Sequence, residues 1–254
     1  MPIIGCSMRS RTNCLENTII IRASVIGNQI KKVNEYFLRL SEMSGKQENT
    51  CLVSCSVLKD ELTQLVKQGN LYANLVFVSK YFHVDYAQIE RNLRPVLEKA
   101  IQQFKGNVIL VYGDLCLGVN NEMRKLAEEY NVVKIDALNC IDCQLGGKGK
   151  FLEADPQHNL MFLSPGMTDF FVHVKNAMRN ENIAEDWLNQ LFSGLQGIVL
   201  LDTLGKPNQL MEEIEKLGTG LCILETRQGG LKNVGTVINE AFEKNREKKK
   251  QTKH

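Results

Sequence analysis

The sequence predicts an α/β protein with a mainly parallel sheet, helices on both faces of the sheet and Rossmann-like layers. From about residue 50 onward, short apolar or β-branched runs alternate with longer amphipathic segments. Each candidate strand is a continuous apolar run, which is typical of strands buried on both faces. Hydrophobic residues make up 43% of the chain and charged residues 24%, which indicates a folded protein rather than a disordered one.

The expected elements follow from these runs and from turn and cap residues. Asp85 and Asn120 are candidate helix N-caps, Pro207 suits a first helical turn, and Gly218 suits a helix end. Strands are expected at 51–55, 75–79, 108–112, 132–136, 160–164, 198–202 and 221–225. Helices are expected at 58–67, 86–104, 121–130, 168–192, 207–217 and 231–244.

The chain divides by composition into three parts. Residues 1–48 lack the strand–helix alternation, and Met43 offers an internal start, so we expect residues 1–42 to be dispensable for folding. An ordinary first strand and helix is the other interpretation. Residues 49–245 form the α/β domain, which could divide into two lobes near 150–167. Residues 246–254 form a basic tail, read as a solvated helix end or as an arm for an anionic partner.

Charge and hydropathy exclude several classes of protein. The net charge of +2 does not suggest a nucleic-acid-binding protein. No run approaches the ~18 apolar residues of a membrane span, and the first residues do not resemble a secretory signal. We therefore expect a cytoplasmic protein. Its eight cysteines are too sparse for a disulfide scaffold and are expected to remain thiols, bind metal or react.

Cysteine and histidine residues follow successive candidate strands. Cys55 closes the first strand, His83 follows the second, Cys116 follows the third, and Cys140 and Cys143 follow the fourth. Ligands of open parallel sheets bind outside the carboxyl ends of the strands. If these strands are parallel neighbours, the five side chains converge on one edge of the sheet and form a functional site.

The chemistry of this set favours a metal. Thiolates suit zinc and iron–sulfur clusters, and neutral imidazole suits zinc, so the sequence predicts zinc with an iron–sulfur cluster as the alternative. Cys55, His83, Cys116, Cys140 and Cys143 are the predicted ligands. Simple packing of the cysteines as small hydrophobic residues is the other interpretation. Cys222, at the start of the last strand, is expected to lie in the core.

A glycine-rich stretch follows the Cys-x-x-Cys pair. Gly146, Gly147 and Lys148 could form a cofactor-binding loop whose backbone amides hold an anion, although the spacing does not match a phosphate-binding P-loop. A simple turn is the alternative.

Short motifs in the middle of the chain carry a family resemblance. They are SCSVLKDE at 54–61, FHVD at 82–85, YG at 112–113 with Cys116, NCIDCQLGG at 139–147 and LSPG at 163–166. With these motifs the chain resembles the prokaryotic family catalogued as domain of unknown function 1638. The resemblance implies a cytoplasmic α/β protein associated with one-carbon and corrinoid methyl-transfer systems. The spacing between Gly113 and Cys116 departs from the tighter Gly-x-Cys of many members, which leaves the role of Cys116 open.

Three functions are compatible with these residues. The first is a metal-binding protein or enzyme in which His83 is a ligand or proton carrier. The second is a metal-free thiol enzyme with Cys140 as nucleophile, His83 as base, and Asp142 or Asp85 orienting the base. The third is a non-catalytic partner of a corrinoid or methyltransferase protein.

Overall fold

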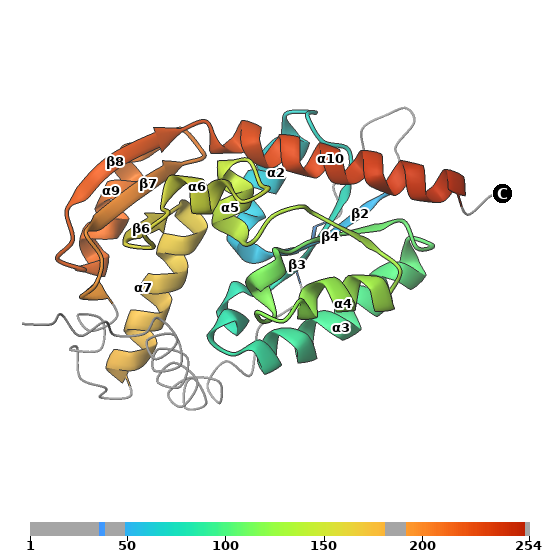
Figure 1. Cartoon of the computed structure of the whole chain (residues 1–254), viewed down its shortest axis with the longest axis horizontal. Coiled ribbons are helices and arrows are strands. Elements are labelled where there is room, and N and C mark those ends of the chain that lie inside the picture. Colours follow the sequence, from blue (N-terminus) through green and yellow to red (C-terminus); the bar gives the residue numbers. More distant parts are fainter. Residues whose placement is uncertain (1–35, 39–48, 181–191, 252–254) are drawn as a thin grey trace, which may run out of the picture.

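The computed structural model describes residues 36–38, 49–180 and 192–251, and in these residues it has two sheets covered by helices (Figure 1). The first sheet has the order β1-β3-β2-β4-β5 and the second the order β6-β7-β8. All described strand pairs are parallel except the edge pair of β1 with β3. The predicted fold class is therefore confirmed. The strands are β1 (Tyr36–Leu38), β2 (Cys51–Cys55), β3 (Asn74–Val78), β4 (Val108–Val111), β5 (Val133–Lys134), β6 (Leu160–Leu163), β7 (Gly197–Asp202) and β8 (Ile223–Gln228).

Helices connect the strands and return the chain across the first sheet. Figure 1 shows the last helix, α10, running from the second sheet back along the first, where it contacts α2, α5 and β4. The α-helices are α2 (Lys59–Lys67), α3 (Tyr86–Gln103), α4 (Glu122–Glu129), α5 (Cys140–Leu145), α6 (Lys150–Ala154), α7 (Pro165–Asn180), α9 (Pro207–Leu217) and α10 (Gly230–Gln251). Short 3-10 helices are η1 (Ser56–Leu58), η2 (Lys80–Val84) and η3 (Asp114–Cys116).

The first sheet is buried on both faces because its side chains alternate between two cores. In β2, Val53 and Cys55 pack with residues of α3 and α4, whereas Leu52 packs with residues of α2 and α10. The second sheet packs against α7 and α9 on one face and against α5 and α6 on the other. The helix α5 thus lies between the two sheets, each of which, together with its covering helices, is called a lobe below.

Several predicted helix ends are confirmed and one is wrong. The Asp85 carboxylate accepts a hydrogen bond from the Ala87 amide, Pro207 opens α9, and Gly218 ends it with a φ of 62°. Asn120 does not cap α4, because the helix begins one residue later and the Asn120 amide instead donates to Glu122.

The last strand is more exposed than its apolar start suggests. The side chains of β8 are largely exposed, and Cys222, just before the strand, is exposed as well. The expectation that Cys222 lies in the core is therefore wrong. Among the described strands, β8 pairs only with β7 and is therefore an edge strand of the second sheet.

The two ends of the chain bear on the domain predictions. Of residues 1–48, the structure describes only β1, which pairs with β3. The dispensability of residues 1–42 stays a prediction, as does the independence of the two lobes.

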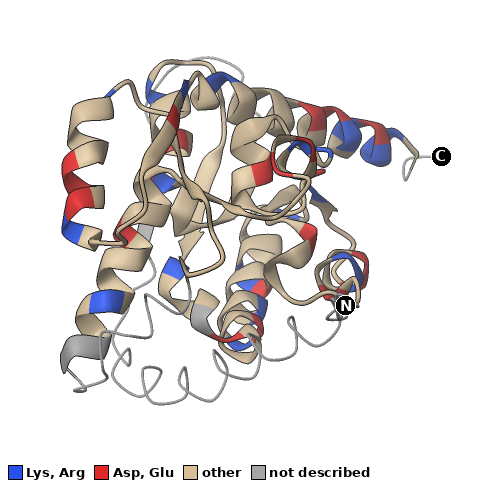
Figure 2. Ribbon diagram, turned by 60° about the vertical axis from the view of Figure 1, so that its left-hand side comes forward, with Lys and Arg blue, Asp and Glu red and all other residues tan. Residues whose placement is uncertain are grey.

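The helix α10 continues to Gln251 and carries both basic and acidic side chains in its last turns (Figure 2). No helix in the described part of the chain is long and apolar enough to cross a membrane.

Candidate functional site: a thiol and imidazole cluster

The carboxyl edge of the first sheet carries four of the predicted site residues. Cys55 is the last residue of β2, His83 lies in η2 after β3, Cys116 ends η3 after β4, and Cys140 opens α5 after β5. Because these strands are parallel neighbours, their carboxyl ends meet at one edge. Cys55 belongs to the core under α3 and α4, and the partly buried Cys116 and Cys140 pack against that same core.

A polar contact joins the side chains of Cys55 and His83. The Cys55 Sγ atom lies 3.6 Å from Nδ1 of His83. The amide of Val57 donates to the same sulfur over 3.4 Å, as the first turn of η1 begins there. The His83 ring meets the Tyr112 ring edge-on, with 6.3 Å between ring centroids. The imidazole is thus held between a thiol and an aromatic ring.

Burial keeps these groups uncharged at neutral pH. It raises the pKa of Cys55 to about 12 and that of Cys116 to about 11, and it raises the pKa of Cys140 well above its usual range. The thiols add to this effect, since a negative charge on Cys116 or Cys55 raises the pKa of Cys140. Burial lowers the pKa of His83 to about 4. The cluster is therefore a set of neutral thiols around a neutral imidazole.

The second lobe covers the cluster through α7. The Cys140 Sγ atom lies 3.7 Å from the Met167 sulfur. Close approach of α7 requires a glycine, because a Cβ atom on Gly166 would lie 2.0 Å from the Val57 carbonyl oxygen. The helix that covers the thiols thus also touches the turn that follows Cys55.

Cys143 lies apart from the other predicted ligands. It is fully buried and packs with residues of α2 and α10, on the opposite core of the first sheet. Burial raises its pKa, and the nearby carboxylates of Glu61 and Asp142 raise it further. Cys140, by contrast, contacts both cores. The Cys-x-x-Cys pair therefore does not present two equivalent thiols to the cluster.

The two aspartates proposed to orient His83 are occupied elsewhere. The Asp142 carboxylate accepts hydrogen bonds from the amides of Leu138, Gly149 and Phe151, at 2.7, 3.1 and 2.8 Å. The Asp85 carboxylate caps α3. Both side chains hold backbone, so a Cys–His–Asp triad does not form through these hydrogen bonds.

The backbone amides of the glycine-rich loop donate hydrogen bonds within the protein. The amides of Gly146, Gly147 and Lys148 donate to the carbonyl oxygens of Cys143, Asp142 and Asp136, respectively. The Lys148 ammonium pairs with Glu240 at 3.0 Å. These donors close the loop onto the protein, and the geometry gives no support for the predicted anion cradle at Gly146, Gly147 and Lys148.

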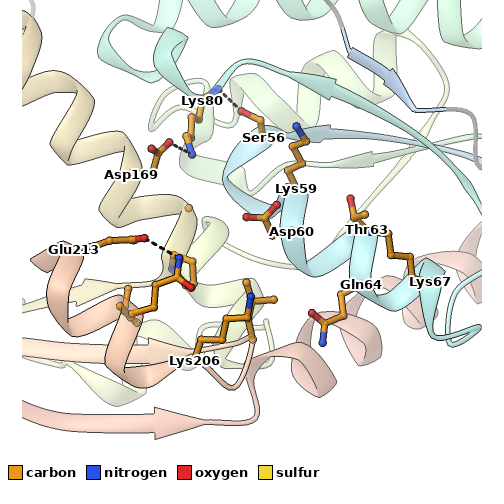
Figure 3. Close-up of a pocket in the computed structure, with 15 residues that line it drawn as sticks. Ser56, Lys59, Asp60, Thr63, Gln64, Lys67, Lys80, Asp169, Lys206 and Glu213 are labelled. Atoms are coloured by element: carbon orange, nitrogen blue, oxygen red, sulfur yellow. Dashed lines mark hydrogen bonds and ion pairs between the residues drawn. The ribbon is translucent and has the colours of Figure 1, made fainter.

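Two features of the lobe interface were not anticipated from the sequence. One is a polar cleft of about 720 Å³ between the lobes (Figure 3). The other is Glu61, which is buried and accepts hydrogen bonds from Thr203 (2.6 Å) and Gln144 (3.4 Å). Burial raises its pKa to about 7. In the sequence Glu61 is one polar residue in an amphipathic helix, so no local signal separates it from its exposed neighbour Asp60.

The six described cysteines are free thiols, as expected. In the described part of the chain, no group of three or more His, Cys, Asp or Glu side chains is already arranged to hold a metal ion. The predicted ligands Cys55, His83, Cys116, Cys140 and Cys143 therefore do not form a ready-made coordination shell. The nearest approach to one is the Cys55–His83 pair with the Cys116 and Cys140 thiols beside it.

The fold and this edge define an α/β protein with a buried thiol and imidazole cluster at the carboxyl ends of its strands. The family model described as "Protein of unknown function (DUF1638)" matches residues 77–238, and the chain belongs to this family. The family resemblance of the sequence motifs is thereby confirmed. No curated protein and no solved structure matches the chain.

Proposed function

We propose that the thiol and imidazole cluster binds a soft metal ion, with zinc favoured, through Cys55, His83, Cys116 and Cys140. The observation that carries this proposal is the 3.6 Å between Cys55 Sγ and His83 Nδ1. In a tetrahedral site with Zn–S bonds of ~2.3 Å and Zn–N bonds of ~2.0–2.1 Å, a sulfur and a nitrogen ligand lie ~3.6 Å apart. The pair is therefore spaced as two ligands of one zinc ion.

Formation of this site requires a change in the protonation of the thiols. Protonated thiols do not coordinate, and each thiol must lose its proton before it binds a metal. Cys116 and Cys140 pack beside Cys55 and are partly exposed, so rotation of their side chains would bring them toward the ion. The Val57 amide that donates to Cys55 favours the thiolate form.

The mixed ligand set favours zinc over an iron–sulfur cluster. Iron–sulfur clusters are held mostly by four cysteine thiolates, whereas zinc is bound by cysteine and histidine together. Cys143, which would have to supply the fourth thiolate, packs in the opposite core of the first sheet. A bound zinc ion with an open position would supply an activated water or thiol for hydrolysis or methyl transfer.

The metal-free thiol enzyme is less well supported. The His83 imidazole contacts the Cys55 thiol, whereas the thiol of the predicted nucleophile Cys140 contacts the Met167 sulfur. A thiol whose pKa is raised well above its usual range and an imidazole whose pKa is lowered to about 4 are a poor nucleophile and a weak base. A metal ion would remove this difficulty because it stabilises the thiolate directly.

The link to one-carbon or corrinoid methyl transfer rests on the family resemblance alone and is part of the proposal, as are the corrinoid or methyltransferase partners. We also propose a cytoplasmic location, since free buried thiols need a reducing compartment. Whether the metal is structural or catalytic decides between an enzyme and an accessory protein.

Metal analysis of protein purified without oxygen tests the proposal. We expect about one tightly bound zinc per chain, as for a four-ligand site. Cys55→Ser should lose the metal, and Cys222→Ser, which changes an exposed cysteine outside the cluster, should retain it. An empty wild-type protein that also fails to bind added zinc or cobalt would refute the metal site.

A further inference from the structure

The cleft between the two lobes is a second site of defined shape. Its volume of about 720 Å³ falls within the range of small-molecule pockets. Residues of η1 and α2 line it from the first lobe, and residues of α7 and α9 line it from the second (Figure 3). It opens at the carboxyl ends of β2 and β7, the edge where parallel sheets bind ligands.

In the charged lining of the cleft, lysines outnumber carboxylates by one. Lys59, Lys67, Lys80 and Lys206 contribute positive charge, against three carboxylates. One of those carboxylates, Asp169, is paired with Lys80 at 2.5 Å. In Figure 3, Lys59 and Lys80 reach the cleft from the first lobe, and Lys206 extends into it from the second. Ammonium groups from both sides suit an anion held between the lobes.

Three helices begin at this cleft and add to its positive potential. Lys59 in the first turn of α2, Gly166 in the first turn of α7 and Lys206, the N-cap residue of α9, line the cleft. The N-cap residues of α2 and α9 form no side-chain hydrogen bond with the helix end. The amides of Lys59 and Lys206 already donate to the Ser56 carbonyl and the Asp202 carboxylate, so the helix ends contribute through their dipoles, which attract negative charge.

A polar side chain in the wall also lacks a partner. Thr63 lines the cleft, and its hydroxyl oxygen is buried in the wall without a hydrogen-bond partner among the described residues. If this side chain rotates toward the cleft, a ligand with hydrogen-bonding groups would satisfy the hydroxyl.

We propose that this cleft binds a small organic anion carrying a phosphate group or several carboxylates, held between Lys80 and Lys206. The site is separate from the metal proposal, because none of its lining residues is one of the proposed metal ligands. It is nevertheless adjacent to the thiol cluster. Ser56 directly follows Cys55 and lines the cleft, and its hydroxyl accepts a hydrogen bond from the Lys80 amide at 2.8 Å. A ligand bound here would lie beside the cluster.

Calorimetric titration with two probe anions tests this site. Pyrophosphate represents phosphate ligands, and citrate represents ligands with several carboxylates, each added at constant ionic strength with chloride as the reference. The variants are Lys80→Ala and Lys206→Ala. The matched control is Lys216→Ala, which removes an exposed lysine from the far end of the same helix that Lys206 precedes.

We expect at least one probe to bind, and each cleft variant to weaken that binding about tenfold, since a hydrogen bond to a charged group contributes this much. Lys216→Ala should leave the affinity unchanged. The probe that binds more tightly assigns the phosphate or the carboxylate class. Failure of both probes to bind would overturn the proposal, and so would an equal loss of affinity in Lys216→Ala. Neither result would touch the metal site, which is read out by zinc content.

Discussion

Replacing Glu61 with glutamine tests the electrostatics of the lobe interface. Glu61 is 1% exposed and is hydrogen-bonded across the interface to Thr203. Its second carboxylate oxygen is buried and has no partner among the described residues. Glutamine keeps the size of the side chain and an oxygen that accepts from Thr203, but it removes the titrating group. The substitution therefore isolates the cost of a buried charge.

The magnitude follows from the shift of the Glu61 pKa from 4.5 to about 7. The folded pKa is raised, so the folded protein binds more protons than the unfolded chain between these two values. The stabilising contribution of protonated Glu61 is complete below pH 4.5 and is lost as the pH rises toward 7. At ~1.4 kcal/mol per pKa unit, the loss is about 3 kcal/mol.

Urea unfolding of wild type and Glu61→Gln between pH 4.5 and pH 8, followed by circular dichroism, measures this loss. We expect similar stability near pH 4.5 and a more stable variant at pH 8, by up to about 3 kcal/mol. The two proteins must be compared at each pH, because His83 adds its own pH dependence to both. Its pKa is lowered in the folded protein, so its contribution to the free energy of unfolding decreases as the pH falls below about 6.5. Glu128→Gln, at an exposed position of α4, is the control. A difference from wild type that does not change with pH would refute the reasoning.

Two further predictions concern packing and thiol reactivity. In urea unfolding, Gly166→Ala should lower the free energy of unfolding by more than about 2 kcal/mol, because the added Cβ would overlap the Val57 carbonyl. The control Gly194→Ala, whose Cβ would meet open space, should change it by no more than about 0.5 kcal/mol. Cys222 is exposed and should react rapidly with iodoacetamide in the folded protein, whereas Cys143 has no exposed surface and should react only after unfolding. Peptide mass mapping after timed labelling measures both rates, and equal rates of modification would contradict the prediction.

The strands, and the chain positions of the cysteines that follow them, could be predicted because both follow from local sequence. Continuous apolar runs at 51–55 and 108–111 become central parallel strands, and parallel strands bring their carboxyl ends together. Cys55, Cys116 and Cys140 therefore gather at one edge once the strand order is known. The sequence could not supply that order, and it did not reveal β1 as an antiparallel edge strand.

The remaining differences arise from contacts between distant segments. Cys143 follows Cys140 by one helical turn, yet its side chain enters the core under α10, a helix almost 90 residues later in the chain. Cys222 resembles a core residue until the exposure of β8 is known. Glu61 and the cleft depend on how the second lobe packs against α2. Such contacts between distant segments leave no periodic pattern in the sequence, so they can be found only in the tertiary structure.

Proton release on zinc binding tests the central claim most directly. At pH 7.5 the thiols of Cys55, Cys116 and Cys140 are protonated and the His83 imidazole is neutral, because their pKa values are shifted by burial. Zinc titrations in buffers of different ionisation enthalpy should therefore release about three protons per ion, one from each thiol that becomes a ligand. Cys55→Ser should release about one proton fewer and bind more weakly, and His83→Ala should weaken binding without changing the proton count. Zinc binding with no proton release, or with the same release in Cys55→Ser, would contradict the proposed thiolate site.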